Sequence, residues 1–482
     1  MVPTLVLLCA YSCAVPLAPG YRIVKQSCEV HFVPGPPAQL EIHELYQLRN
    51  VGNSDLTFLD ANFPDEREFG RTDLRAEIDG HTVALAPLPG DYQDEQPNAL
   101  RIALDSPWQP KQTRTLSIEY SFTSPGNSGA RITLGESEFH MGSRTWFPEL
   151  ERPKHLLAPD PKPLSPVIYM FRVPSDFVVL ARGTPKGQKR EGNETEYRFV
   201  VTSDDLPPFV VAGRYIATPA NPRAQSAAFW TLQPLKEDPA PTLQQIAAAW
   251  NTLETDFGPL DKNIALPHVV ESSELRGQLS GEDGAAAVAF PGGTIVNPAA
   301  LALGVGSSEF LDLVSHALAH NWFGDELRPS SESSIGIGEG LPAYATIVID
   351  EARNGSAGRR RRVMEYLRRY DEARTRADEK PLAVTMLTDP IGPRRIALAK
   401  APLFYVALED VCGPTEVRRG LAHLVTLMRG QEVDYKELRS ALEQSTNRDL
   451  GQMFRLWLNQ KGIPQDFRDR YPLGPAGQET GE

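Results

Sequence analysis

The sequence predicts an α+β protein of more than one domain, in which an amino-terminal antiparallel β-domain precedes a mainly helical domain. Three observations support this prediction. The chain has 482 residues, which is more than one ordinary hydrophobic core accommodates. From residue 21 to about residue 215, apolar and polar residues alternate in short runs separated by Pro, Gly, Asn and Asp. From residue 242 onward, apolar residues recur at helical spacing.

Residues 1–20 predict a leader segment that precedes the folded domains. Residues 5–15 are apolar and too short to cross a bilayer comfortably, and prolines and a glycine follow them, as at the end of a secretory signal. We therefore expect export to the periplasm, the extracellular space or the cell surface. No basic residue precedes the apolar run, which leaves a hydrophobic first strand or a truncated start as alternatives. Membrane attachment is expected only through a lipid on Cys9 or Cys13.

Residues 21–215 form the expected β-domain, and residues 216–470 the helical one. In the first range, residues 115–122 read Thr-Leu-Ser-Ile-Glu-Tyr-Ser-Phe, an alternation that places every second side chain on one face of a strand. A proline-bearing connection at residues 218–223 marks the predicted boundary. Residues 471–482 contain little that can pack, and we expect them to form a tail.

Charge and composition narrow the possible functions. The net charge is −13, and the one sustained basic run is Arg359–Arg362. Nucleic acid is not an expected partner, because proteins that bind it present basic surfaces. The run lies in a predicted helix, where it is either a solvated helix face or an anion-binding patch. The 42 prolines are scattered, which favours a β-rich protein with rigid loops over a helical bundle.

The strongest functional signal is His316-Ala-Leu-Ala-His320, followed eighteen residues later by Glu339. Two histidines at positions i and i+4 project from one helical face, so both imidazoles can reach one ion, and a carboxylate can complete a three-ligand zinc site with an open fourth position. Without the acid, two core histidines would be the simpler interpretation. The spacing of all three residues favours a site for one zinc ion.

Helix signals surround both parts of this pattern. Ser307 and the acids that follow it predict a capped helix that carries both histidines. A second helix is expected to open at Gly338, with Pro342 tolerable in its first turn and Asn354-Gly355 as a stop. Glu339 then lies rigidly near a helix start.

The residue after the first histidine departs from the pattern of active enzymes. In H-E-x-x-H enzymes, that residue is the general base that deprotonates the metal-bound water. Here it is Ala317. The sequence therefore predicts a zinc site without the usual catalytic carboxylate.

Residues 316–325, His-Ala-Leu-Ala-His-Asn-Trp-Phe-Gly-Asp, and the segment Gly338-Glu339-Gly340-Leu341 resemble the gluzincin peptidases of the alanyl aminopeptidase (aminopeptidase N) family, whose pattern is H-E-x-x-H-x-W-F-G-[N/D] followed by N-E-G-[F/L]. Tyr344 belongs to the same pattern. Further landmarks of the family occur in the same order along the chain, at residues 145–148, 173–174, 208–215, 257–259 and 457–464.

The resemblance implies an α+β multidomain fold, with an amino-terminal antiparallel β-sandwich followed by a thermolysin-like, mainly helical zinc domain. It implies a zinc metallopeptidase that acts on peptides or proteins. The long helical carboxy-terminal domain of many relatives is missing from this sequence, so we expect a more open zinc face. Asp325 is a candidate to orient a histidine ligand through a hydrogen bond, or it is an ordinary helix-terminal acid.

Two further departures from the family pattern accompany Ala317. The family's G-x-M-E-N loop, whose glutamate grips a free amino terminus, has no counterpart in residues 280–293. The family's oxyanion-stabilising tyrosine, in Y-x-K-G-A, is replaced by Leu398, and no motif assigns that role to the nearby Tyr405. A positioned base supplies roughly 10²- to 10⁴-fold and an oxyanion donor roughly 10²- to 10³-fold in rate. Residues 282–283, Glu-Asp, are either a substitute base or a solvated turn.

Two functions remain open. The first is a homologue that binds zinc and peptides but has lost, or strongly weakened, hydrolysis, that is, a pseudoenzyme. The alternative is an active zinc-dependent peptidase, or an engineered inactive form of one. The sequence favours the first, because three separate catalytic features are missing. It does not predict the peptide recognised or the oligomeric state.

Overall fold

The protein is described from a computed structural model, which covers residues 20–63, 71–88, 98–123, 132–142, 146, 148–151, 165–201, 209–219, 227–260, 267–275 and 286–473. The chain divides into two compact units. The first unit comprises Met1–Gly126, Arg144–Ser175 and Pro185–Asp204, and the second comprises Asn127–Ser143, Asp176–Thr184 and Asp205–Glu482. The expected leader lies outside the described residues except for Gly20, and the domain bounds given above stay a prediction.

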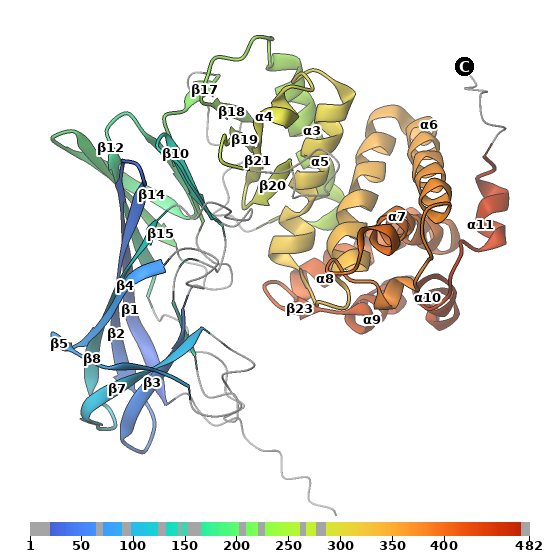
Figure 1. Cartoon of the computed structure of the whole chain (residues 1–482). Coiled ribbons are helices and arrows are strands. Elements are labelled where there is room, and N and C mark those ends of the chain that lie inside the picture. Colours follow the sequence, from blue (N-terminus) through green and yellow to red (C-terminus); the bar gives the residue numbers. More distant parts are fainter. Residues whose placement is uncertain are drawn as a thin grey trace, which may run out of the picture. The chain divides into compact units, whose positions relative to one another are not determined.

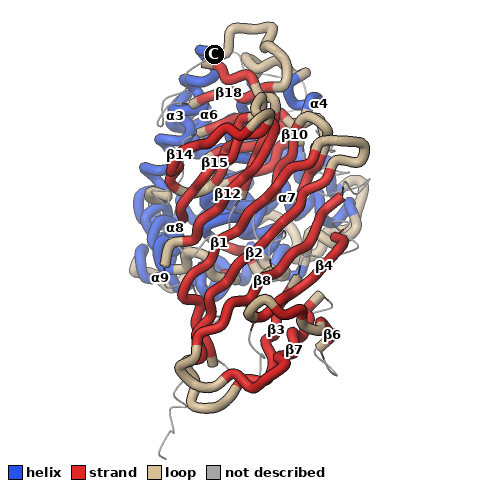
Figure 2. Tube along the Cα trace, turned by 90° about the vertical axis from the view of Figure 1, so that its left-hand side faces the viewer, coloured by secondary structure: helices blue, strands red, loops and turns tan. Residues whose placement is uncertain are grey.

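Two β-sheets build the first unit. The larger has eight strands in the order β14-β15-β12-β1-β2-β8-β4-β5, and Figure 2 shows them running obliquely side by side. Their bounds are β1 Tyr21–Val33, β2 Gln39–Asn50, β4 Arg71–Ile78, β5 His81–Thr82, β8 Thr113–Thr123, β12 Val167–Pro174, β14 Thr184–Glu191 and β15 Glu194–Val201. The smaller sheet has the order β11-β3-β7-β6, with β3 Leu56–Asn62, β6 Leu85–Pro87, β7 Ala99–Trp108 and β11 Glu149–Glu151.

Alternation of apolar and polar residues explains these strands. In β2 and β8, every second side chain is buried, and the two strands pair antiparallel with Glu44 opposite Ile118. The larger sheet is not purely antiparallel, because β1 and β12 pair in parallel. More than a hundred residues separate these two strands, which is ample chain for the long connection that a parallel pair requires.

A carboxyl group lies inside this sheet region. Glu44 is fully buried and accepts a hydrogen bond from the Gln26 amide at 3.4 Å, while its Oε1 has no hydrogen-bond partner among the described residues. Burial raises the pKa of Glu44 to about 7, although hydrogen bonds from Cys28, Gln26 and Tyr46 act in the opposite direction.

The second unit combines two sheets with a set of helices, seen in yellow to red in Figure 1. One sheet has the order β13-β16-β10-β9 and the other β17-β18-β19-β21-β20. The strands are β9 Ile132–Leu134, β10 Glu138–Met141, β13 Val178–Ala181, β16 Val210–Gly213, β17 Ile216–Thr218, β18 Ala228–Thr231, β19 His268–Glu271, β20 Ala287–Phe290 and β21 Gly293–Val296, and a short pair joins β22 Arg328–Pro329 to β23 Glu432–Val433.

Helix α3 lies between β18 and β19 in sequence, and the other helices follow β21. They are α3 Ala240–Phe257, α4 Pro298–Leu301, α5 Ser308–Ala319, α6 Gly340–Arg374, α7 Ile391–Cys412, α8 Pro414–Leu427, α9 Tyr435–Thr446, α10 Gly451–Leu458 and α11 Gln465–Arg470. Together the two units confirm the predicted α+β class, with a β-sheet region first and a helical region after it. None of the helices among the described residues combines the length and apolarity needed to cross a membrane.

Gly355 does not stop the helix as the sequence indicated. Helix α6 continues to Arg374, and Gly355 forms a kink with φ of 64°. Glycine adopts positive φ without steric cost, so the chain changes direction there and then resumes the helix. The second half of α6 thereby becomes part of the wall beside the candidate metal centre.

The Arg359–Arg362 run is solvated only in part, because Arg360 and Arg361 are exposed whereas Arg359 and Arg362 face neighbouring helices. Arg359 pairs with Glu409 of α7, and Arg362 pairs with Asp312 of α5. These two arginine side chains are only 13% and 15% exposed. Arginines one turn apart that face two different helices hold those helices together, so the run fixes α5 and α7 against α6.

Replacing Glu44 with Gln tests the buried carboxyl group. Because the folded-state pKa lies above the usual value of 4.5, the folded protein binds more protons than the unfolded chain between pH 4.5 and about 7, and Glu44 lowers stability as pH rises through that window. We expect the difference in free energy of unfolding, Glu44→Gln minus parent, to rise by on the order of 3 kcal/mol from pH 4 to pH 8. Urea unfolding of both proteins across this pH range measures the difference. A constant difference across this range would contradict the assignment.

Candidate metal centre

Helix α5 positions both histidines. Its N-cap is Ser307, whose hydroxyl accepts a hydrogen bond from the Phe310 backbone N–H at 3.1 Å, as the sequence predicted. Apolar residues bury one face of the helix, and His316 lies in its last turn. His320 caps the carboxyl end of the helix, so it lies at the helix boundary rather than inside the helix.

The turn after His320 is fixed by two side chains. Asn321–Glu326 form a π-helical turn. The Asn321 amide accepts from the Gly292 N–H at 2.8 Å and donates to the Gly293 carbonyl at 3.2 Å, which connects this turn to strands β20 and β21. The Trp322 indole donates to the Gly258 carbonyl at 2.8 Å, at the end of α3. The Asn-Trp residues of the motif therefore anchor the end of α5.

Aromatic rings continue this anchoring into the following helices. The Trp250 and Trp322 ring centroids are 4.8 Å apart, and those of Phe257 and Phe323 are 4.9 Å apart. Phe257 also contacts Tyr344 of α6, with centroids 6.2 Å apart. These edge-to-face contacts bury large apolar areas, so they hold α3, the π-helical turn and α6 in one packed cluster.

Glu339 precedes α6 and ends a second π-helical turn, Ser334–Glu339. The glycines on both sides of Glu339 explain the Gly-Glu-Gly segment. A Cβ atom at Gly338 would lie 2.9 Å from Pro329, and one at Gly340 would lie 2.8 Å from Ala401. Only glycine lets the backbone come this close to Pro329 and Ala401. This backbone position places the Glu339 carboxylate near the histidines.

The three predicted ligands converge. The two histidine Nε2 atoms are 3.2 Å apart, and Glu339 Oε2 lies 3.4 Å from His316 Nε2 and 3.7 Å from His320 Nε2. Ligand atoms of a tetrahedral zinc ion, each at about 2.0–2.2 Å, are separated by about 3.3–3.6 Å, so the three atoms fit one ion. Among the described residues, this is the one cluster of three such side chains that could hold a metal.

Electrostatics suits a cation at this place. Burial lowers the pKa of His320 to about 4, even though the Glu339 carboxylate opposes the change, so the ring is neutral near pH 7 and able to coordinate. Burial acts to raise the pKa of Glu339, but the two histidines outweigh it and hold that pKa below its usual value. Each of the three side chains keeps between 24% and 33% exposure, which leaves one side of the site accessible.

Among the described residues, the Asp325 side chain makes no hydrogen bond to either histidine ring, although the Asp325 backbone N–H donates to the His320 carbonyl at 3.0 Å. The ring of His320 instead hydrogen-bonds the backbone of Phe323. Asp325 Oδ2 is buried without a hydrogen-bond partner among the described residues, and burial raises the pKa of this carboxyl to about 7. The π-helical turn brings a backbone carbonyl close enough to orient the imidazole, a detail that the sequence pattern did not indicate.

The positions that depart from the family pattern carry no substitute side chain. Ala317 is 2% exposed, and its methyl group offers no proton acceptor. Leu398 lines the cavity beside the histidine and glutamate. Tyr405 is fully buried, and its hydroxyl donates to the Gly336 carbonyl at 2.8 Å, so it does not replace the missing tyrosine. Residues 282–283 lie outside the described residues, and residues 286–293 contain no carboxylate.

A buried ion pair fixes the segment of α7 that carries Leu398. Lys400 lies two residues further on, is 1% exposed, and donates to Glu379 at 3.2 Å and to the Gln460 carbonyl at 2.7 Å. Glu379 also accepts from the Tyr370 hydroxyl at 2.7 Å and from the Gly462 N–H at 2.8 Å. The network connects α6, α7 and the segment after α10, so it holds one wall of the cavity in place.

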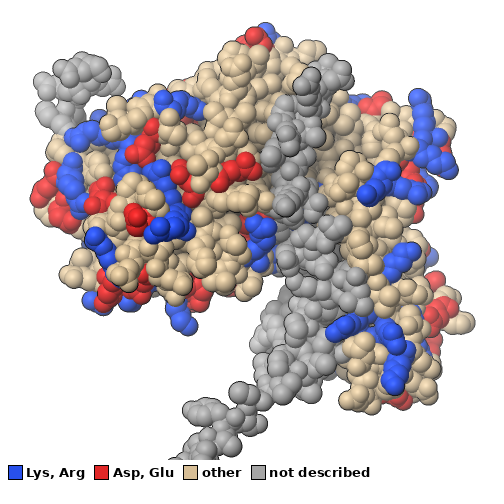
Figure 3. Space-filling view, turned by 180° about the vertical axis from the view of Figure 1, so that it is seen from behind, with Lys and Arg blue, Asp and Glu red and all other residues tan. Residues whose placement is uncertain are grey.

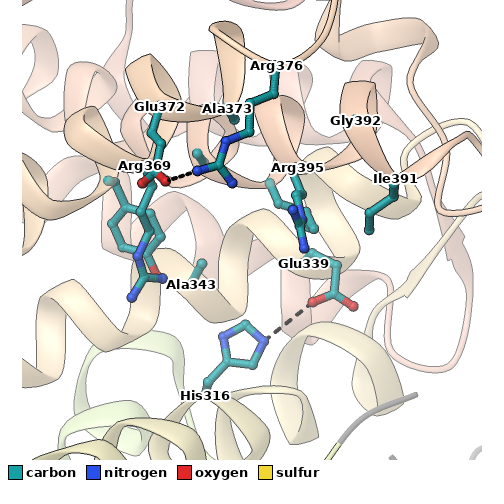
Figure 4. Close-up of a pocket in the computed structure, with 13 residues that line it drawn as sticks. His316, Glu339, Ala343, Arg369, Glu372, Ala373, Arg376, Ile391, Gly392 and Arg395 are labelled. Carbon is teal, nitrogen blue, oxygen red and sulfur yellow. Dashed lines mark hydrogen bonds and ion pairs between the residues drawn. The ribbon is translucent and has the colours of Figure 1, made fainter. Parts of the chain in front are cut away.

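A cavity of about 620 Å³ opens beside the candidate ligands, and the sequence analysis missed most of its residues. It is lined by His316, Glu339, Ala343, Tyr366, Arg369, Glu372, Ala373, Arg376, Ile391, Gly392, Arg395, Leu398 and Ala399. Their spacing contained a signal, because these positions recur every three or four residues on α6 and on α7. In Figure 4, the side chain of Arg395 points toward Glu339, and that of Arg376 reaches Glu372.

Comparison with known proteins agrees with this geometry. Residues 292–457 match the Peptidase family M1 domain. No curated protein matches the sequence. Among solved structures, the M1 zinc metallopeptidase of Deinococcus radiodurans has a TM-score of 0.62 and 15% identity, covering 92% of this chain and 95% of that one.

Two further structures have similar values. A glutamate-to-alanine mutant of the Deinococcus radiodurans peptidase, bound to a Tyr-Ser-Ala substrate, has a TM-score of 0.63 and 15% identity, covering 92% of this chain and 96% of that one. A two-domain M1 zinc metallopeptidase mutant bound to L-tryptophan has a TM-score of 0.63, 16% identity and the same coverage. At these identities the likeness establishes the fold.

Replacing Lys400 with Met tests the network behind Leu398. The change leaves the buried Glu379 carboxylate without its cation, so we expect the free energy of unfolding to fall by roughly 3 kcal/mol in urea unfolding followed by tryptophan fluorescence. Lys461→Met is the matched control, because Lys461 is exposed next to the same network. Equal effects of the two substitutions would contradict the stabilising role of the buried pair.

Proposed function

We propose that this chain, in which residues 292–457 match the Peptidase family M1 domain, is a homologue of the M1 zinc metallopeptidases that binds one zinc ion and peptides but has lost, or strongly weakened, peptide hydrolysis. His316, His320 and Glu339 would hold the ion. A bound zinc ion supplies Lewis-acid polarisation of a carbonyl and a more acidic water. The family match and the donor set, two imidazoles and one carboxylate, both imply zinc.

The loss of hydrolysis is proposed from the side chains around the ligands. The observation that carries it is Ala317, a buried methyl group where the family pattern has the general base. Besides Glu339, Glu372 is the one carboxylate on the described cavity wall, and it is paired with Arg376 at 2.7 Å. Tyr366 also lines the cavity, and burial raises the pKa of its hydroxyl. Neither Glu372 nor Tyr366 occupies the positions of the family's general base and tyrosine, which hold Ala317 and Leu398.

Peptide binding is proposed from the cavity. Its volume of about 620 Å³ lies within the range of roughly 300–1,000 Å³ that is typical of ligand pockets. The Deinococcus mutant bound to Tyr-Ser-Ala shows that an M1 peptidase with a glutamate replaced by alanine can retain a peptide. Export of the chain is also part of the proposal, on the leader signal in residues 1–20.

Zinc binding can be tested on protein stripped of metal and then dialysed against zinc. We expect about one zinc per chain by elemental analysis, and none for His320→Ala, because removal of one of three ligands opens the tripod. His423→Ala is the control, since that histidine is exposed on α8. Leu398→Tyr should keep the zinc. A parent protein free of zinc, or a His320→Ala variant that still holds it, would overturn the assignment.

Restoring a carboxylate tests the loss of hydrolysis. We expect Ala317→Glu to create peptide hydrolysis that a chelator abolishes, at a rate on the order of 10²-fold or more above the parent. Ala317→Gln is the matched control, because it has the same shape without a basic oxygen.

The same assay separates the two functions. Zinc-dependent hydrolysis by the parent at the rate of Ala317→Glu would favour the alternative, an active zinc-dependent peptidase. Absence of hydrolysis in Ala317→Glu, with zinc bound, would show that one carboxylate does not suffice. The double variant Ala317→Glu with Leu398→Tyr then measures what the missing tyrosine contributes.

A further inference from the structure

We propose that the cavity beside the candidate metal centre selects peptides that carry a carboxylate, through Arg369, Arg376 and Arg395. This inference rests on the proposed peptide binding and deepens it by naming the substrate class. All three arginines line the cavity that contains His316 and Glu339. A peptide held at the candidate ligands would therefore place a neighbouring part within reach of guanidinium groups.

The charges of the cavity wall support this choice. Three arginines and two carboxylates, Glu372 and the candidate ligand Glu339, line the cavity. Arg369 is also paired with Glu365, and Arg376 is paired with Glu372. The lining therefore carries more basic than acidic side chains, although the net charge of the chain is −13. On the face seen in Figure 3, acidic and basic side chains are intermixed over the helical unit. A concave wall with one predominant sign concentrates ligands of the opposite sign, so the cavity favours anions although the chain as a whole is acidic.

Two helices that meet at the cavity present the arginines. Arg369 lies on α6 and Arg376 follows the end of that helix, and they are on the same side as Tyr366 and Ala373, at intervals of three and four residues. Arg395 lies on α7, one turn before Leu398. The Arg376 guanidinium is already oriented by Glu372 at 2.7 Å, which reduces the conformational freedom that it loses on binding.

The remaining wall fits the same ligand. Ala343, Ala399 and Leu398 contribute apolar surface close to the candidate ligands, and Ile391 is 41% exposed at the edge. An apolar wall beside guanidinium groups suits a short aliphatic stem that ends in a carboxylate. Guanidinium groups bind carboxylates through paired N–H donors, and this geometry distinguishes a carboxylate from an amide of the same shape. The carboxylate can come from an acidic side chain or from the carboxyl end of the peptide.

Calorimetry on the zinc-loaded parent chain tests the proposal. The probes are pentapeptides of alanine with a central Asp, Asn or Lys, each with a free or an amidated carboxyl end. We expect the Asp peptide to bind about three- to tenfold more tightly than the Asn peptide, and the Lys peptide to bind most weakly, with the difference shrinking as salt is added. Preference that survives amidation assigns the side chain as the source, and preference for free over amidated ends assigns the terminus.

Variants identify the residues. Arg376→Gln with Arg395→Gln should abolish the preference for carboxylate while leaving zinc content unchanged. Arg368→Gln is the matched control, since Arg368 is exposed on α6 and does not line the cavity. Peptides that bind with equal affinity whatever their charge would overturn the preference and leave peptide capture standing. Failure of every peptide to bind the zinc-loaded chain would overturn both proposals, and a preference that persists in the double variant would overturn the role of these arginines.

Discussion

The convergence of two imidazoles and one carboxylate is the constraint on which the rest of the second unit depends. The three donor atoms lie between 3.2 and 3.7 Å apart, although His316 and Glu339 come from different helices. Three donor atoms this close to one another require that their helices be held in fixed positions. Arg362 holds α5 to α6 through Asp312, and packed aromatic rings hold α3 and α6 around the π-helical turn. These contacts therefore help to fix the positions of the helices that carry the three side chains.

The residues that hold the candidate ligands in place differ in character from those at the expected catalytic positions. The supporting residues are engaged in hydrogen bonds or aromatic contacts, as Asn321, Trp322 and Lys400 show. The positions that would transfer a proton or stabilise an oxyanion hold Ala317 and Leu398. Both residues are apolar; Ala317 is buried and Leu398 lines the cavity.

The candidate ligands were predictable because their signal is local. The i and i+4 spacing and the Ser307 cap act within a few residues, and the structure has the cap as expected, although His320 lies at the end of α5 and α6 begins at Gly340 rather than Gly338. Other features depend on contacts between distant residues. The Gly355 kink looked like a helix end, since only packing against α7 shows that the helix resumes. The shared cavity of Arg369, Arg376 and Arg395 could not be predicted, because it forms only where α6 and α7 pack together. Their helical spacing alone was visible in the sequence.

The buried Lys400–Glu379 pair links parts of the second unit that are far apart in sequence. Through Gln460 and Gly462, the pair couples the helix bearing Leu398 to the closing stretch of the chain. The Lys400–Glu379 pair thus connects the helix at the cavity wall to the segment after α10. The cavity wall that carries Leu398 is therefore tied by hydrogen bonds to residues some sixty positions further along the sequence, which do not line the cavity themselves.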